Sequence, residues 1–438
     1  MRVLFVEPPD PPGFVSFRHS HGGYGEFCVS SRLRIPTLDL FHCAAFLREG
    51  GVDASVLDSA LLGHSPRACV AEIARRRPAL VAFRTASGSC LSDLKTAALL
   101  RRSWDAPVVF FGPHAAAETE RLLASPGVDA VASGEPYEAF LRMARQDGFA
   151  GIAGVRFRDP DGGLAGDGSS PRLKDLDSLP VPRWDEVPFQ RYSYVTAQTS
   201  WGCPRTCSYC PYRITQGSRW RTRSAASVVR EFQALRDRYG LRYVELRDPE
   251  FACGRERTLR LCRALRDAGT PILWGCETGL DTLDPELLAA MAGAGCIRLK
   301  FGVDTLNPET LRRTGRRALA PAEVRRRVEQ IRRSGMLTYA FYMIGLPGET
   351  TRSTLDLIEF SLDLGTHIAS FSAATPFAGT ALARDARAFG RYETLDPLHL
   401  TSCVPSMRNE TMDAAEIGRL YRLAKSRWKE RSPASSPR

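Results

Sequence analysis

Several features that would place this sequence in a simple class are missing from it. No run of about 18 apolar residues is present, which is the length a membrane-spanning helix needs. The first residues reach an acid and two prolines directly after Val3–Val6, which predicts a strand rather than a secretory signal. Composition excludes the collagen, coiled-coil and disordered classes, and no repeat of solenoid period occurs. We therefore expect a globular protein without a membrane segment.

Two binding signatures are missing as well. No G-x-G-x-x-G follows the first predicted strand, so a dinucleotide is not expected there. No run of Lys and Arg with interleaved aromatic residues forms a platform for nucleic acid, and no nucleic-acid partner is expected.

The charge is unevenly distributed along the 438 residues, a length that suits two or three domains. The chain has 60 basic and 49 acidic side chains, a net charge of +11. Residues 1–150 hold 16 of each sign, so residues 151–438 carry the whole excess. This excess could attract an acidic or phosphorylated partner, or it could reflect the Arg-rich surfaces that a GC-rich genome encodes.

The first part of the chain, 1–145, alternates predicted strands with predicted helices. The strands are expected at 3–6, 52–57, 80–83, 107–111 and 128–131. Such alternation predicts a parallel, doubly wound (Rossmann-like) sheet, which binds its ligands at the carboxyl ends of its strands. The candidate ligand-binding residues at those ends are Thr85, Ser87, Gly112, His114, Gly134 and Glu135.

A second strand–helix series follows a turn-rich connector at 146–192. Its strands are expected at 194–199, 243–246, 272–274, 297–301, 338–344 and 368–372. This pattern over 193–388 predicts a partial (βα)6 TIM-like barrel, in which chemistry occurs at the carboxyl ends of the strands. A short tail, 389–438, is expected to hold one helix at 412–430 and a disordered end at 432–438.

Three of the twelve cysteines are clustered, whereas nine are scattered and mostly suit a buried core. Cys203, Cys207 and Cys210 form a C-x3-C-x2-C pattern. A structural zinc site takes four ligands, so zinc would need a distant fourth residue. A cubane iron–sulfur cluster held by three cysteines would keep one iron open for a substrate or cofactor.

This spacing, at the end of the first barrel strand, resembles the radical S-adenosylmethionine (SAM) superfamily. The resemblance implies a [4Fe-4S] cluster on the three cysteines, with SAM bound at the open iron. It also implies that Tyr209 lies beside the adenine and that Asp248 or a neighbour meets the methionyl amino group. Asp304 would bind the ribose, and Gly345 in G-L-P-G-E would lie on the adenine side. Each of these acids could instead cap a helix or form a turn.

The N-terminal part is similar to the cobalamin (B12)-binding subgroup of that superfamily. The matching segments are Val3–Pro9, Leu40–Gly50, Phe111–His114 and Val128–Glu135 in the first part, and Arg219–Arg223, Glu277, Phe301–Asp304 and Thr375–Thr380 in the barrel. The resemblance implies that cobalamin lies at the strand ends named above. One departure is the absence of D-x-H-x-x-G, whose His ligates cobalt in some members. Arg84 stands where the lower corrin face would lie, and it could guard the cobalt, bind a substrate phosphate or form a salt bridge.

The implied function is a cobalamin-dependent radical SAM C-methyltransferase of specialised metabolism, such as antibiotic biosynthesis. Such an enzyme cleaves SAM to a 5′-deoxyadenosyl radical, and no catalytic side chain is expected beyond the cofactors. The alternative is a cobalamin-independent dehydratase, deoxygenase, cyclase or oxidase acting on a sugar-like metabolite. A sensor of B12 or oxygen would make no use of the SAM-site residues. An RNA methylthiotransferase would carry a second three-cysteine set and an RNA-binding domain.

The expected partners are a small-molecule substrate and an electron donor such as a flavodoxin or ferredoxin. Twelve cysteines without an export signal imply a reducing compartment, so a cytoplasmic location is expected.

Overall fold

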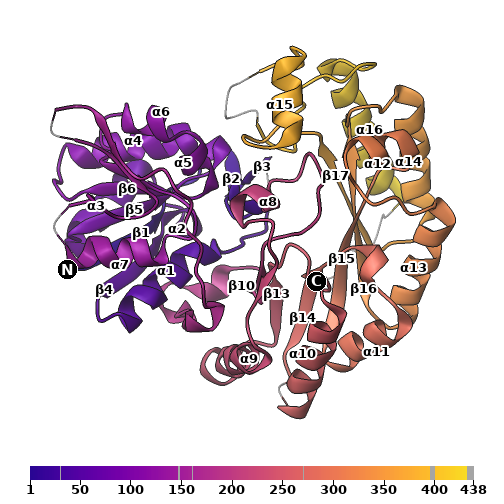
Figure 1. The fold of residues 1–438 in the computed structure, drawn as a ribbon, viewed down its shortest axis with the longest axis horizontal. Helices are drawn as coiled ribbons and strands as arrows, with labels where there is room; N and C mark the ends of the chain where they lie inside the picture. The colour runs from indigo at the N-terminus through magenta and orange to yellow at the C-terminus, as the bar shows by residue number, and fades with distance from the viewer. Residues whose placement is uncertain (30, 147, 160, 270, 395–399, 432–438) are drawn as a thin grey trace. The chain divides into compact units, whose positions relative to one another are not determined.

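The computed structural model describes residues 1–438 except 30, 147, 160, 270, 395–399 and 432–438. The chain divides into two compact units, Met1–Thr196 and Ala197–Arg438. Each unit is described by itself below (Figure 1).

The first unit is built on a mainly parallel sheet. Its strands are β1 (Arg2–Glu7), β2 (Phe14–Phe17), β3 (Glu26–Val29), β4 (Asp53–Asp58), β5 (Leu80–Arg84), β6 (Val108–Phe111), β7 (Ala130–Ala132), β8 (Val155–Arg158) and β9 (Leu164–Gly166). Its helices are α1 (Leu38–Glu49), α2 (Ser59–Leu62), α3 (Pro66–Arg76), α4 (Cys90–Arg101), α5 (Pro113–Ala117), α6 (Thr119–Leu123) and α7 (Tyr137–Arg145). The sheet has the order β4-β1-β5-β6-β7-β8-β9, and the strands from β4 to β7 run parallel. The strand order reverses between β1 and β5, which is where a doubly wound sheet binds its ligand.

Both faces of this sheet are covered, as the apolar strands predict. Leu4 and Val6 of β1 belong to a core shared with α3 and α4. Phe5 points the opposite way and meets Phe140 of α7 edge-to-face, with the ring centroids 4.9 Å apart. A strand that is buried on both faces is a continuous run of apolar residues in the sequence, and this is why these strands could be predicted.

The connector predicted at 146–192 contains two short strands. Two of its segments form β8 and β9, which pair antiparallel and extend the N-terminal sheet next to β7. The first compact unit accordingly continues to Thr196. Turn residues dominate this stretch in the sequence, but its short strands add to an existing sheet edge and so need little apolar surface of their own.

The second unit is a partial βα barrel. Its strands are β10 (Val195–Ala197), which straddles the boundary, β11 (Ser200–Trp201), β12 (Arg221–Thr222), β13 (Tyr243–Leu246), β14 (Leu273–Glu277), β15 (Cys296–Asp304), β16 (Leu337–Ile344) and β17 (Ile368–Ala373). Its helices are α8 (Tyr212–Thr215), α9 (Ala225–Tyr239), α10 (Arg255–Asp267), α11 (Pro285–Gly293), α12 (Pro308–Arg313), α13 (Pro321–Arg333), α14 (Thr351–Asp363), α15 (Ala381–Ala388) and α16 (Ala414–Arg431).

The main sheet of this unit has the order β10-β13-β14-β15-β16-β17, with parallel pairing from β13 to β17. The predicted fold class is therefore confirmed for both units. The tail helix expected at 412–430 is α16, while the end expected to be disordered, 432–438, lies outside the described residues.

Helix ends in the barrel follow local signals. Ser224 caps α9 by accepting a hydrogen bond from the Ser227 N–H, and Gly240 ends that helix with a φ of 66°. Asp284 caps α11 in the same way, directly before Pro285. These caps set where each helix starts, and thereby where the preceding strand-end loop closes.

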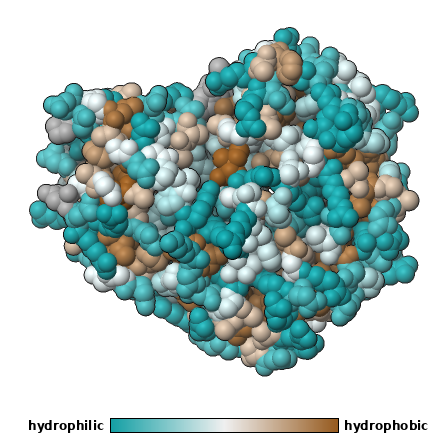
Figure 2. Space-filling model, in the orientation of Figure 1, coloured by the Kyte–Doolittle hydropathy of each residue, from teal (hydrophilic) through white to brown (hydrophobic). Residues whose placement is uncertain are grey.

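No helix within the described parts of the chain is long and apolar enough to cross a membrane. On the face drawn in Figure 2, hydrophobic residues are dispersed among hydrophilic ones. The most exposed large apolar side chain of the described residues is Phe389, at 66%.

Candidate active site

The three clustered cysteines lie in the loop that follows the first barrel strand. β11 pairs antiparallel with β12, and the loop begins at Gly202, whose φ is 81°. The Cys203 N–H donates to the Gly217 carbonyl at 3.0 Å, and the Cys210 N–H donates to the Cys207 carbonyl at 3.2 Å. The loop thus folds back on itself and places the cysteines at the carboxyl end of the barrel.

The sulfur environment suits an iron–sulfur cluster. Burial raises the pKa of Cys203 to about 11 and also raises that of Cys210. The backbone N–H of Arg205 faces the Cys203 sulfur and that of Tyr212 faces the Cys210 sulfur, and each lowers the pKa of its thiol in part. Backbone N–H groups directed at cysteine sulfurs are among the contacts that tune such clusters.

A structural zinc ion fits this loop less well. Among the described residues, no three His, Cys, Asp or Glu side chains gather as ligands of a single metal ion. A zinc site needs its ligands to converge on one ion, whereas the cysteines of a cubane cluster bind different irons and stand further apart. The three-cysteine loop, with backbone N–H groups directed at two of its sulfurs, suits the cluster that the sequence predicts.

Two acids after β13 anchor the cysteine loop. Asp248 accepts hydrogen bonds from the Thr199 N–H at 2.7 Å and from the hydroxyls of Thr199 and Ser200, both at 2.6 Å. Glu250 pairs with Arg205 at 2.5 Å, and Arg205 also pairs with Asp281 at 2.8 Å. The Asp248 carboxylate is therefore occupied by Thr199 and Ser200, which directly precede the cysteine loop, and it helps to position that loop. Glu250 also contacts the loop, through Arg205.

Tyr209 and Asp304, both predicted to bind SAM, lie together in the structure. The Tyr209 hydroxyl donates to Asp304 Oδ2 at 2.9 Å. Arg316 Nε lies 2.8 Å from the same oxygen, and Arg316 Nη1 lies 4.0 Å from the Cys207 sulfur. Asp304 has a left-handed φ of 61°, which is uncommon for a residue other than glycine but more accessible to aspartate than to most, and the pairing of β15 with β16 is irregular there.

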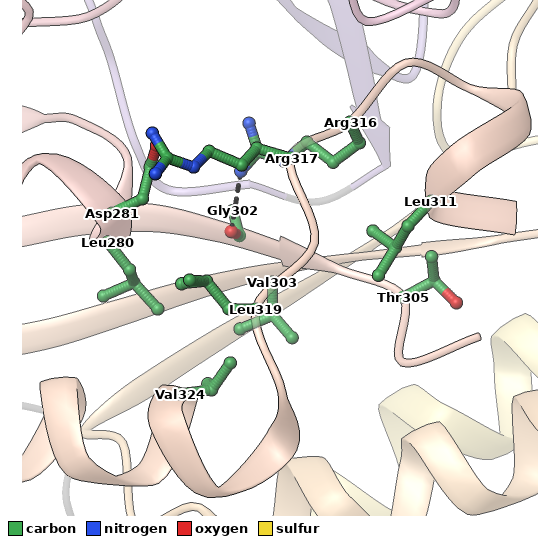
Figure 3. Close-up of a pocket in the computed structure, with 10 residues that line it drawn as sticks. All are labelled: Leu280, Asp281, Gly302, Val303, Thr305, Leu311, Arg316, Arg317, Leu319 and Val324. Atoms are coloured by element: carbon green, nitrogen blue, oxygen red, sulfur yellow. Dashed lines mark hydrogen bonds and ion pairs between the residues drawn. The ribbon is translucent and has the colours of Figure 1, made fainter. Parts of the chain in front are cut away.

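A small pocket lies beside this group. Gly302 and Arg316 line it together with Thr305 and Leu311, and Arg316 Nη2 donates to the Gly302 carbonyl at 2.8 Å (Figure 3). The neighbouring Arg317 turns away toward Asp281, at 3.2 Å.

Glu277 lies at the end of β14 on the same face of the sheet as a charged cluster. The register places Glu277 next to Lys300, and Lys300 Nζ pairs with Glu245 at 2.6 Å. Burial raises the pKa of Glu277 to about 7, against the opposing effect of Lys300 and Arg247. A strand-end carboxyl group whose pKa is raised by burial is a candidate functional group.

Gly345, expected on the adenine side, has a structural explanation. Its φ is 90°, and an added Cβ would lie 2.8 Å from Ile417 Cδ1 of α16. The glycine is therefore needed for the tail helix to pack on this turn.

The predicted cobalamin contacts of the first unit are covered by the chain itself. Thr85 and Ser87 are buried, and the Ser87 N–H donates to the Tyr24 carbonyl at 2.8 Å. The Thr85 hydroxyl donates to Asp93 at 2.8 Å. Residues 18–27 thus lie over this strand end. They include the first two residues of β3, which pairs with β2 in a hairpin that the sequence analysis did not predict.

Gly134 and Glu135 are covered by a second segment. The Glu135 N–H donates to the Pro171 carbonyl at 2.9 Å, and the Glu135 carboxylate accepts from the Leu173 N–H at 2.8 Å. Gly134 permits this approach, since an added Cβ would overlap the Pro171 carbonyl. Gly134 and Glu135 therefore contact the segment that follows β9, around Pro171.

His114 is also buried at this edge, and Gly112 is half-buried. Gly112 has a φ of 104°, and an added Cβ there would overlap the Arg84 guanidinium. Burial lowers the pKa of His114 to about 3, so its imidazole is neutral. Its Nδ1 lies 3.2 Å from Ser87 Oγ, and its Nε2 has no hydrogen-bond partner among the described residues.

Arg84 forms a buried salt bridge, which was one of its three predicted roles. Its Nε lies 3.0 Å from Asp39 Oδ2, and its Nη2 donates to the Gly23 carbonyl at 3.1 Å. Its side chain is completely buried.

Three residues of the barrel site were missed by sequence reasoning. Arg205 stands inside the cysteine motif, Glu250 follows Asp248 by two residues, and Arg316 lies in the loop after α12. The position of Arg205 within the motif was a signal that could have been followed. The local sequence does not distinguish Arg316 from its neighbours, because residues 312–317 contain four arginines.

Comparison with known proteins places the barrel in a known family. Residues 198–361 match the family model of the radical SAM superfamily. This part of the chain is a radical SAM domain, and the predicted family is confirmed.

Relatives and solved structures extend the likeness to the whole chain. It is 26% identical to an uncharacterized methyltransferase of Pyrococcus horikoshii, over 97% of this chain and 91% of that protein. It is 27% identical to the cytidylyl-2-hydroxyethylphosphonate methyltransferase of Streptomyces wedmorensis, over 63% of this chain and 60% of that protein. The radical SAM methyltransferase TsrM of Kitasatospora setae, solved with cobalamin and a [4Fe-4S] cluster, superposes with a TM-score of 0.71 at 20% identity. That match covers 96% of this chain and 85% of TsrM, so the chain has the fold of a cobalamin-dependent radical SAM enzyme.

Proposed function

We propose that this protein cleaves SAM at a [4Fe-4S] cluster and acts as a cobalamin-dependent C-methyltransferase on a small molecule of specialised metabolism. The observation that carries the SAM chemistry is the joint placement of the cysteine loop, Tyr209 and Asp304 at one end of the barrel. Methyl transfer is supported by the names of the relatives and by the fold shared with TsrM.

The barrel residues have separable tasks in this proposal. Cys203, Cys207 and Cys210 would hold the cluster, and the Arg205, Glu250 and Asp248 contacts fix the loop that carries them. Asp304 would accept a ribose hydroxyl of SAM, with Tyr209 beside the adenine. When it is reduced and bound to SAM, the cluster would supply the radical. The remaining tasks of the protein are to bind SAM and the substrate, to orient them and to exclude water from the site.

The fold shared with TsrM supports cobalamin as a cofactor of this proposal. Several of the predicted strand-end residues contact residues 18–27 or the segment around Pro171. Cobalamin, when bound, would carry the methyl group. The second candidate is a cobalamin-independent dehydratase, deoxygenase, cyclase or oxidase that uses the same radical.

One preparation distinguishes these functions. Protein purified anaerobically from cobalamin-fed cells and reconstituted with iron and sulfide is assayed for corrinoid per chain and for 5′-deoxyadenosine formed from SAM. About one corrinoid per chain with SAM cleavage supports the methyltransferase. SAM cleavage without corrinoid overturns it in favour of the second candidate, and absence of both contradicts the radical proposal itself.

A cysteine pair provides the matched control. Cys207→Ser is expected to lose iron and 5′-deoxyadenosine formation. Cys253→Ser, at a half-buried cysteine outside the motif, is expected to keep both. Equal iron loss in the two variants would contradict the assignment of the ligands.

A further inference from the structure

We infer that Arg316 couples the SAM-binding acid to the iron–sulfur cluster: it raises the reduction potential of the cluster and orients Asp304 for the ribose. The inference rests on the proposed function, since it requires that the three cysteines hold a cluster.

The backbone holds Arg316 against the cysteine loop. The Ser208 N–H donates to the Thr314 carbonyl at 2.8 Å, and the Thr206 hydroxyl donates to the Gly315 carbonyl at 3.3 Å. Gly315 has a φ of 65°, and an added Cβ would lie only 2.9 Å from the Thr206 carbonyl oxygen. The segment 314–316 thus lies along the cysteine loop on both sides of Cys207, and these contacts do not depend on the side chain at 316.

The guanidinium of Arg316 reaches three groups in different directions. Nε lies 2.8 Å from Asp304 Oδ2, Nη2 donates to the Gly302 carbonyl at 2.8 Å, and Nη1 lies 4.0 Å from the Cys207 sulfur. A planar fork of donors can make these contacts at once, whereas a lysine ammonium is a single point of charge. The absence of a side chain at Gly302 provides space for the guanidinium, since an added Cβ would lie 2.8 Å from Nη2.

The charge of Arg316 acts on the cluster. Its side chain is only 15% exposed, so water screens the guanidinium weakly. Taking up an electron makes an iron–sulfur cluster more negative, and a fixed positive charge beside one of its ligands favours the reduced state. Removing this charge should therefore make reduction harder.

The same side chain prepares Asp304 for SAM. Tyr209 and Arg316 both bind Oδ2, and no described residue donates a hydrogen bond to Oδ1. Oδ2 is held by the Tyr209 hydrogen bond and by the Arg316 ion pair, while Oδ1 remains for a ribose hydroxyl. Loss of the fork should release the carboxylate and weaken SAM binding.

Three variants separate the charge of Arg316 from its geometry. Each reconstituted protein is measured for iron content, for cluster potential by spectroelectrochemical titration, and for SAM affinity without turnover. Arg316→Gln should lower the potential and weaken SAM binding about tenfold, as expected for loss of a charged hydrogen bond. Arg316→Lys should keep the potential close to that of the wild type while SAM binding weakens. Arg317→Gln, at the adjacent and 71% exposed arginine of Figure 3, should change neither quantity.

The outcomes distinguish this inference from the proposed function. If the wild-type protein binds no iron, the proposed function fails. If Arg316→Gln holds a full cluster with the potential and SAM affinity of the wild type, the inference is overturned and the proposed function stands. If Arg316→Gln does not retain its cluster, Arg316→Lys decides: weaker SAM binding at an unchanged potential supports the inference, and no change in either overturns it.

Discussion

At the scale of single residues, Glu277 is the barrel acid whose protonation changes near neutral pH. Burial raises its pKa from 4.5 to about 7, so the folded protein keeps a proton that the unfolded chain releases. The contribution of Glu277 to stability is therefore greatest below pH 4.5 and is lost as the pH rises to about 7, with a slope of at most about 1.4 kcal/mol per pH unit. Denaturant unfolding of wild type and Glu277→Gln between these pH values measures it, and the difference between the two should change with pH in this direction. A difference that is constant across the range would contradict the raised pKa.

Tyr209 provides a second prediction at this scale. Its hydroxyl donates to a buried carboxylate, a type of bond whose removal costs about 1 to 2 kcal/mol. Tyr209→Phe should lower the free energy of unfolding by about this amount and weaken SAM binding several-fold, because Asp304 loses the hydrogen bond that holds its Oδ2. Iron content should remain that of the wild type, since no cysteine is touched. Loss of iron in this variant would instead place Tyr209 among the residues that shape the loop.

At the scale of structural elements, the cysteine loop is held by ion pairs from two strand ends. Arg205 lies between Glu250 and Asp281, whose side chains are 4% and 9% exposed. Arg205→Gln leaves the nearly buried Glu250 without its cation and leaves Asp281 with Arg317 alone, which costs about 3 kcal/mol. We expect lower thermal stability and less iron per chain after reconstitution, although all three ligands remain. Arg213→Gln, at an exposed arginine of α8 directly after the loop, is the matched control and should bind iron as the wild type does. Equal iron in both variants would show that the loop does not need this anchor.

The elements of both sheets could be predicted because their signals are local. Parallel strands that are buried on both faces are continuous apolar runs in the sequence. Helices α9 and α11 begin after a capping Ser or Asp, and α9 ends at a glycine. The β2–β3 hairpin was missed because its residues, 14–29, hold three glycines and two histidines in place of an alternating pattern. Its stability comes from contacts distant in sequence, such as Phe27 against Gly88.

The candidate site was predicted in part for the same reason. A strand end marks Asp304 as a candidate, but whether its carboxylate is open or occupied depends on residues far along the chain. Asp248 looked equivalent in the sequence, but its oxygens accept hydrogen bonds from Thr199 and Ser200, 49 and 48 residues away. Arg316 could not be singled out, because its partner Cys207 lies 109 residues earlier. Sequence patterns locate the edge of a sheet, while the pairing of charges at that edge follows from tertiary structure.

At the scale of the whole molecule, the uneven charge leads to a test of the electron donor. The excess of +11 belongs to residues 151–438, which include all of the barrel and its cysteines. If this excess steers an acidic donor protein, association should be fast at low salt and slow once the Debye length falls below about 10 Å. We expect the rate of cluster reduction by a flavodoxin to fall about tenfold or more as ionic strength rises to several tenths molar. Reduction by a small neutral mediator is the control, because it has no charge to steer. A flavodoxin rate that ignores salt would favour the other interpretation, in which the arginines are solvated surface groups without a partner.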